Sequence, residues 1–132
     1  LYDGMTDLFK SLQNAGIQIV MATSKPEVFA RQIAEYFHID SYFTCITGSE
    51  LDGTRVAKDE VIACAMERIG IKDATGAIMV GDRMHDIVGA KKNGMTSVGV
   101  LYGYGNRIEL EDARADYIVE SVEELRKLLL SM

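Results

Sequence analysis

The chain has 132 residues, of which 48% are hydrophobic and 26% are charged, so its size and composition indicate one ordinary globular domain. Its net charge of -6 repels the backbone of nucleic acids and no run of Lys or Arg offsets that charge, which argues against a nucleic-acid partner. No stretch approaches the roughly 18 apolar residues of a membrane helix, and the first residues do not form a secretory leader, so we expect a cytoplasmic protein without a membrane partner.

The N-terminal third of the chain alternates helix, strand and helix. Apolar residues recur at helical spacing over 5–15, and Gly16 then predicts a helix end. The apolar, β-branched run 17–22 predicts a strand that is covered on both faces. Ser24 predicts the N-cap of the next helix, with Glu27 as its capping-box partner. We expect that helix to face inward through its large apolar side chains, which are Phe29, Ile33 and Phe37.

The rest of the chain repeats the order of strand and helix. Short apolar and β-branched runs predict strands at 43–47, 77–81, 96–100 and, as a short edge strand, 117–119. Helical periodicity and end signals predict helices at about 57–69, at 86–92 and after the capping box of Ser121 and Glu124.

Strands that alternate with helices predict an α/β fold with right-handed crossovers. We expect a three-layer, doubly wound, mainly parallel sheet of about four or five strands, formed as a single domain by residues 1–132. In such sheets ligands bind at the carboxyl ends of the strands, so the residues directly after each strand are the candidates for function.

Thr23 and Ser24 follow the first predicted strand and precede a helix. Hydroxyls, free backbone N–H groups and the positive end of a helix together suit an anion such as phosphate. Simple helix capping explains the same residues, so this segment alone leaves both interpretations open.

Asp82 and Asp86 follow the third predicted strand, where it turns into a helix. Such a pair suits Mg²⁺, which takes one or two carboxylates and completes its shell with water and phosphate oxygens. A turn-forming Asp82 and a helix-terminal Asp86 are the plainer alternative. Because Asp82 follows a nearly continuous apolar run, where a carboxylate needs a partner, we favour a magnesium site.

Lys58 begins the helix after the second predicted strand. A cation in the first turn opposes the helix dipole, which indicates a charge partner across the crevice, although surface lysines are common. His38 and His85 lack the spaced companions of a zinc site, so we assign them no chemistry. Cys45 and Cys64 lie in apolar surroundings and are expected to be inert, buried thiols.

The order of Thr23, then Lys58, then Asp82 and Asp86, each after a successive strand, resembles the haloacid dehalogenase superfamily. The likeness covers nearly the whole chain. The segments that are similar to its phosphoglycolate phosphatase-like branch are 20–26, 81–90 and 101–105.

The resemblance implies a Rossmannoid core and a role for each of these residues. Thr23, with Ser24, would bind the transferring phosphoryl group, and Lys58 would neutralise charge on the phosphate and the nucleophile. Asp82 and Asp86 would bind Mg²⁺ directly or through water. Thr23 and Lys58 are thus the candidate catalytic residues of this chain.

The chain departs from the superfamily at its start. Members begin with a strand ending in Asp-x-Asp-Gly-Thr, whose first Asp attacks phosphorus and whose second is the general acid and base, before a helical cap. Neither is visible here, and the chain, which lacks an initiator methionine, is similar to the C-terminal part of the core. Asp3-Gly4 has no preceding strand, and the segment 50–54 has Glu50 in the nucleophile position and ordinary turn chemistry.

In the superfamily the nucleophile strand is central, between the strands at 17–22 and 77–81. Without that strand, the facing edges of these two strands have two alternatives. If they stay apart, each backbone group that is buried without a hydrogen bond costs about 1–3 kcal/mol of stability. If they pair with each other, the sheet has the flavodoxin-like strand order 2-1-3-4. Our hypothesis is that the core arrangement is kept only if another segment supplies the central strand, either the missing N-terminal segment or another copy of the chain.

The resemblance implies part of a magnesium-dependent phosphatase that hydrolyses a small phosphomonoester through an aspartyl-phosphate intermediate, with this chain inactive alone. The alternative is a non-catalytic, flavodoxin-like or receiver-like module that binds phosphate and metal. A third interpretation is a structural subunit whose acidic residues only solvate its surface. The identity of the phosphomonoester depends on the cap, which is not visible in this sequence.

Overall fold

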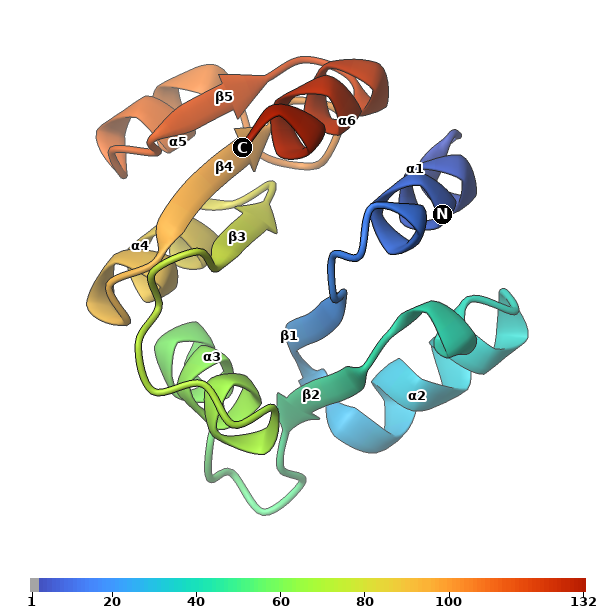
Figure 1. The fold of residues 1–132 in the computed structure, drawn as a ribbon. Helices are drawn as coiled ribbons and strands as arrows, with labels where there is room; N and C mark the ends of the chain where they lie inside the picture. Colours follow the sequence, from blue (N-terminus) through green and yellow to red (C-terminus); the bar gives the residue numbers. More distant parts are fainter. Residues whose placement is uncertain (1–2) are drawn as a thin grey trace.

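The computed structural model describes residues 3–132, and these form alternating helices and strands, as predicted (Figure 1). The strands are β1 (Val20–Pro26), β2 (Cys45–Ser49), β3 (Ile78–Gly81), β4 (Thr96–Val100) and β5 (Tyr117–Val119). The α-helices are α1 (Met5–Asn14), α2 (Glu27–Tyr36), α3 (Lys58–Arg68), α4 (Met84–Lys92), α5 (Arg107–Asp112) and α6 (Val122–Ser131), with a short 3-10 helix at Asp40–Tyr42.

All strand pairs are parallel, but the strands form two separate sheets (Figure 1). One sheet is β1-β2, with Val20 opposite Cys45, and the other is β3-β4-β5, with Ile78 opposite Thr96. Within residues 3–132 no strand pairs with the facing edges of β1 and β3. The arrangement in which those edges close to the order 2-1-3-4 is therefore wrong for this structure.

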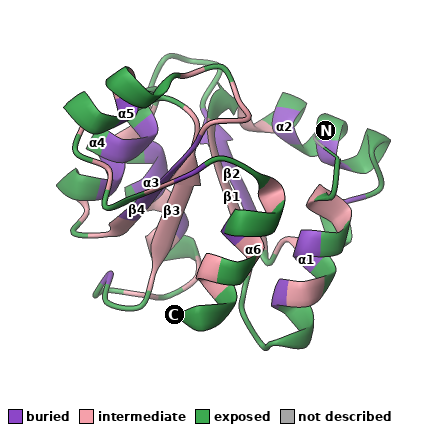
Figure 2. Ribbon diagram, turned by 90° about the horizontal axis from the view of Figure 1, so that it is seen from above, coloured by how far each residue is buried: buried purple, intermediate pink, exposed green. Residues whose placement is uncertain are grey.

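Helices cover the strands on two faces, which gives the predicted three layers (Figure 2). The helices α3, α4 and α5 lie on one face, and α1, α2 and α6 lie on the other. This distribution follows from right-handed crossovers, because connections that run toward opposite ends of a parallel sheet place their helices on opposite faces.

Helix packing holds the two sheets together in the absence of strand pairing. On one face, Leu8 and Leu12 of α1 pack with β4, β5 and α6, while Phe9 packs with α2 and β2. On the other face α3 packs on α4, and Asn93 donates a side-chain hydrogen bond to the Asp59 carbonyl at 3.0 Å. The carboxyl ends of β1 and β3 are therefore held in one region by the helical layers.

The inner face of α2 differs from the prediction. Ala30 and Ala34 are its buried residues, whereas Phe29, Ile33 and Phe37 are 48%, 42% and 43% exposed. The expectation that these three face inward is wrong, because the small alanine side chains let the helix approach the sheet closely. These three larger apolar side chains are instead partly exposed to solvent.

The start of α2 is also different. β1 continues through Pro26, which pairs with Ser49, so α2 begins only at Glu27 and Pro26 is its N-cap. No side chain caps this helix, and the predicted capping box of Ser24 and Glu27 is wrong.

The bounds of other strands and helices can be compared with the sequence predictions. β4 and β5 coincide with the predicted strands at 96–100 and 117–119, while β2 begins two residues after its predicted start. The short helix α5 was not predicted, although Asn106 caps it by accepting a hydrogen bond from Glu109 N at 2.8 Å.

In the part of the chain that the structure describes, no helix is long and apolar enough to cross a membrane.

Candidate functional site

A buried ion pair joins the start of α3 to the start of α4. Lys58 Nζ lies 2.7 Å from Asp86 Oδ1, and the two side chains are only 9% and 6% exposed. The predicted charge partner of Lys58 is thereby confirmed, and it is Asp86. A cation in the first turn of α3 is tolerated because a carboxylate lies within contact distance.

Lys58 also reaches β1, the strand that contains Thr23. Its Nζ donates a hydrogen bond to the Ala22 carbonyl at 3.2 Å, which joins the start of α3 to β1. One ammonium group therefore contacts both β1 and the first turn of α4. This contact brings the segment of Thr23 and the segment of Asp86 to the same place.

The backbone orients Asp86 on the other side. Arg83 N donates to Asp86 Oδ2 at 3.2 Å, and a Cβ built on Gly81 would overlap the Asp86 carboxylate. Only glycine at the end of β3 leaves room for this side chain. The carboxylate is thus held between β3 and the first turn of α4.

Asp82 is held by the loop that follows β4. Tyr104 N donates to Asp82 Oδ2 at 2.8 Å, and Cβ atoms at Gly103 and Gly105 would overlap Asp82. The Gly-Tyr-Gly sequence therefore lets a loop backbone lie directly against this carboxylate. The carboxyl ends of β3 and β4 converge at Asp82.

Thr23 and Ser24 lie in the last part of β1. Thr23 Oγ1 accepts a hydrogen bond from Lys25 N at 3.2 Å, and Ser24 is exposed. Since α2 begins at Glu27, its free N–H groups lie beyond this segment. The hydroxyls are accessible, but the helix terminus is not adjacent to them in the way that the sequence suggested.

The sequence profile described as haloacid dehalogenase-like hydrolase matches residues 1–100. The chain belongs to this family.

The similar proteins of this family carry several names. A 5'-nucleotidase of Pseudomonas aeruginosa is 42% identical over 131 residues, which cover 99% of this chain and 59% of that protein. The tyrosine-protein kinase PtkA of Mycobacterium tuberculosis is 37% identical over 132 residues, 98% of this chain and 45% of PtkA. A phosphoglycolate phosphatase of Vibrio parahaemolyticus is 29% identical over 129 residues, 98% of this chain and 56% of that protein.

Solved structures of the family share the same fold. The crystal structure of a predicted phosphatase from Clostridium acetobutylicum is 49% identical and superposes with a TM-score of 0.97, over 99% of this chain and 60% of that one. The chain thus spans roughly half to three fifths of the length of the proteins that it matches.

Asp82 and Asp86, which both follow β3 in this haloacid dehalogenase-like chain, are carboxylates of the kind that Mg²⁺ takes as ligands. Asp86 Oδ1 is buried and, apart from its ion pair with Lys58, has no hydrogen-bond partner among residues 3–132. No cluster of three or more His, Cys, Asp or Glu side chains occurs in that range, so Asp82 and Asp86 would contribute two carboxylates at most. This number fits Mg²⁺, which usually fills the rest of its shell with water and phosphate oxygens.

Two side chains near the acidic pair had no role in the sequence analysis, which assigned no chemistry to His85 and did not consider Glu109. His85 Nε2 lies 3.8 Å from Asp86 Oδ1, and Glu109 accepts hydrogen bonds from Met84 N at 2.6 Å and Arg83 Nε at 2.9 Å. The hydrogen bond from Arg83 lowers the pKa of Glu109 below its ordinary value. Glu109 thereby braces the first turn of α4, a role that only the position of α5 reveals.

The segment 50–54 has its own structural explanation. Asp52 Oδ1 accepts hydrogen bonds from Thr54 N and Thr54 Oγ1 at 3.0 and 2.7 Å, and Glu50 pairs with Arg55 at 2.6 Å. Both carboxylates are occupied within one exposed loop. This supports turn chemistry for the segment over a nucleophile.

Proposed function

We propose that this chain is the phosphate- and magnesium-binding part of a phosphatase that hydrolyses a small phosphomonoester. The single observation that supports this most is the buried Lys58–Asp86 pair in contact with the Ala22 carbonyl of β1. It brings an ammonium group, a carboxylate and the strand segment that contains Thr23 together near the carboxyl ends of the strands. In parallel α/β folds this is where ligands bind.

Each residue has a task that its chemistry suits. Lys58 would neutralise the negative charge on the phosphoryl group and on an attacking carboxylate. Thr23 and Ser24 would donate hydroxyl hydrogen bonds to phosphate oxygens. Asp82 and Asp86 would hold Mg²⁺, which supplies charge stabilisation to the phosphoryl group when it is bound.

The nucleophile in this proposal is an aspartate outside the chain that forms an aspartyl-phosphate intermediate. Residues 1–132 contain no Asp-x-Asp-Gly-Thr sequence, and the facing edges of β1 and β3 are unpaired among residues 3–132. A parallel strand placed between these edges would deliver its last residues beside Thr23, Lys58 and Asp82. We therefore expect the single domain of residues 1–132 to be a core that lacks its nucleophile strand and cap.

The substrate class follows the shared chemistry of the relatives' names. Both 5'-nucleotidase and phosphoglycolate phosphatase denote hydrolysis of a phosphate monoester, so we propose that class and no particular compound. The second candidate is a non-catalytic module that binds phosphate and metal through the same residues.

Binding and turnover of the pure chain test the proposal. Titration with MgCl2 should shift the amide NMR signals of 81–86, and inorganic phosphate added afterwards should shift those of Thr23 and Ser24. Hydrolysis of p-nitrophenyl phosphate should stay at background, and a synthetic peptide that carries an Asp-x-Asp-Gly-Thr strand should raise it. Magnesium-dependent hydrolysis by the pure chain would show that the nucleophile lies within it, while unchanged spectra would refute the binding site. Binding without any gain in turnover would favour the non-catalytic module.

A further inference from the structure

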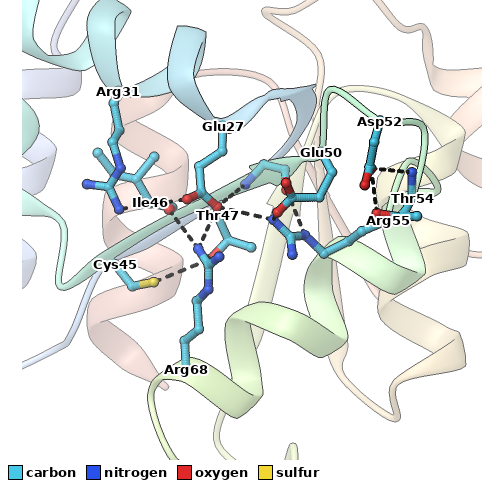
Figure 3. A network of polar contacts seen from close by, with 11 residues as sticks. Glu27, Arg31, Cys45, Ile46, Thr47, Glu50, Asp52, Thr54, Arg55 and Arg68 are labelled. Atoms are coloured by element: carbon cyan, nitrogen blue, oxygen red, sulfur yellow. Dashed lines mark hydrogen bonds and ion pairs between the residues drawn. The ribbon is translucent and has the colours of Figure 1, made fainter.

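A polar network at the free edge of β2 connects the start of α2 with the loop between β2 and α3 (Figure 3). At its centre, Glu27 Oε1 accepts hydrogen bonds from Gly48 N at 3.2 Å, Arg68 Nη1 at 2.5 Å and Arg55 Nη2 at 3.4 Å. Burial by itself would raise the pKa of Glu27, but the hydrogen bonds from Arg68 and Gly48 outweigh it and the pKa lies below its ordinary value. Glu27 is therefore a charged anchor directly after the Thr23 segment.

Arg55 ties this anchor to the loop between β2 and α3. Its Nε donates to the Gly48 carbonyl at 2.9 Å, and its Nη2 pairs with Glu50 at 2.6 Å. The side chain is only 19% exposed. The Arg55 backbone has φ 50°, an uncommon left-handed conformation for a residue other than glycine, which persists where surrounding contacts impose it.

Gly48 is the point at which the Thr23 segment touches β2. A Cβ on this residue would lie 2.5 Å from the Lys25 carbonyl and 2.7 Å from Glu27 N, so the backbone of 25–27 runs against it. Arg55 donates hydrogen bonds to both Gly48 and Glu27. Its guanidinium therefore contacts the segment that follows Thr23. Arg55 itself lies only three residues before Lys58 in the chain.

We propose that Arg55 is a positioning residue: it locks the loop before Lys58 against the segment after Thr23, so that the Lys58 ammonium reaches Ala22 and Asp86. The inference deepens the proposed function, on which the phosphate-binding role of Lys58 rests. A planar guanidinium suits this task because it serves several acceptors at once in a rigid geometry, which a lysine ammonium does not reproduce.

Arg68 provides a matched comparison on the same anchor. It binds Glu27 as Arg55 does, and it also donates to the Ile46 carbonyl at 3.3 Å. However, Arg68 is the last residue of α3 and Lys58 is the first, so the two lie about 15 Å apart along the helix. Arg68 therefore covers the edge of β2 without touching the loop that carries Lys58.

The experiment compares Arg55→Gln with Arg68→Gln in the 132-residue chain. The first readout is the NMR signal of the Lys58 ammonium group, assigned by its loss in Lys58→Met. Because that group is buried and paired, its signal should be visible in the wild type and in Arg68→Gln. In Arg55→Gln it should broaden as exchange with water becomes at least about tenfold faster, which corresponds to roughly 1.4 kcal/mol.

The second readout is the affinity for inorganic phosphate in the presence of MgCl2. We expect Arg55→Gln to weaken binding about tenfold and Arg68→Gln to change it less than about twofold, although Arg68→Gln lowers the melting temperature. Arg55→Lys keeps the positive charge but lacks the planar guanidinium, so the broadening of its Lys58 signal should lie between those of the wild type and Arg55→Gln. It serves as the test variant if Arg55→Gln does not fold.

The possible results separate the two claims. An unchanged Lys58 signal in the Arg55 variants would overturn the positioning role, and so would equal effects of the Arg55 and Arg68 variants on it. If the wild type binds neither Mg²⁺ nor phosphate while its Lys58 signal still depends on Arg55, the proposed function fails and the positioning role stands.

Discussion

Two polar clusters of the chain use charge in different ways. Around Glu27, two arginines and a backbone N–H converge on one carboxylate oxygen, and the cluster also satisfies backbone groups at the edge of β2. At Lys58 and Asp86, one ion pair is nearly buried, and Asp86 Oδ1 has no hydrogen bond from the described residues. The first cluster braces the outer edge of β2, whereas the second joins two charges directly beside the strand ends at which we propose that the ligand binds.

The location of each cluster agrees with this difference. The Glu27 cluster covers the outer edge of β2, where exposed backbone groups would otherwise invite pairing with another strand. The Lys58–Asp86 pair lies between the facing ends of β1 and β3, where no strand within residues 3–132 fills the space. A buried charge pair is weak evidence for stability, so its position beside the strand ends agrees with the function that we propose.

The largest expected effect comes from breaking the buried pair. Asp86→Ala leaves the Lys58 ammonium buried without a counter-charge, which should lower the free energy of unfolding by about 3–5 kcal/mol. Urea unfolding measures this loss. The double variant Lys58→Met with Asp86→Leu should recover most of it, because no unpaired charge remains. A loss below about 1 kcal/mol in Asp86→Ala would mean that Lys58 finds water, and the contrast between the clusters would disappear.

A smaller effect, with a defined pH dependence, is expected at Glu27. Glu27→Gln should cost about 1 kcal/mol at neutral pH, since a partly exposed carboxylate loses its charge-assisted hydrogen bonds. The folded-state pKa is below the ordinary value of 4.5, so the unfolded chain binds the proton more readily and this stabilisation is present above that value. It should be lost as the pH falls through the folded pKa.

Urea midpoints of the wild type and Glu27→Gln at pH 7, 5 and 3 check this window. Other carboxylates titrate equally in both proteins, so the difference between them isolates Glu27. A difference that stays constant from pH 7 to pH 3 would contradict the role of the Glu27 charge.

The smallest effect is expected in the loop that contains Asp52. Its carboxylate accepts hydrogen bonds from Thr54 within an exposed turn, so Asp52→Ala should leave the melting temperature within about 2 °C of the wild type. Magnesium and phosphate affinities should also be unchanged. A loss of either affinity in this variant would return the loop to consideration as part of the site.

Local sequence patterns predicted elements best where a single signal dominated. The runs at 96–100 and 117–119 are short, β-branched and bounded by turns, and they match β4 and β5. Helix α2 was misread because its buried side is made by Ala30 and Ala34, while its larger apolar side chains are partly exposed to solvent. Hydrophobic size is a poor guide where close approach to a sheet selects small residues.

For the site, the sequence indicated residues but not their contacts. The unfavourable place of Lys58 at a helix start predicted a partner, yet only the packing of α3 on α4 identifies that partner as Asp86. Likewise Arg55 and His85 have no local signal, because their contacts come from segments far away in the chain or from side-chain orientation. The roles of Thr23, Ser24, Asp82 and Asp86 in binding stay predictions.

Periodicity and order along the chain were enough to predict the alternation of strands and helices, the family resemblance and the polar residues that follow the strands. The three-dimensional structure was needed to show that β1 and β3 do not pair with each other, that Lys58 meets Asp86 and Ala22, and that Arg55 joins the loop before α3 to the segment after Thr23. These contacts depend on how helices pack on the two sheets, and packing joins groups whose separation along the chain no local pattern encodes.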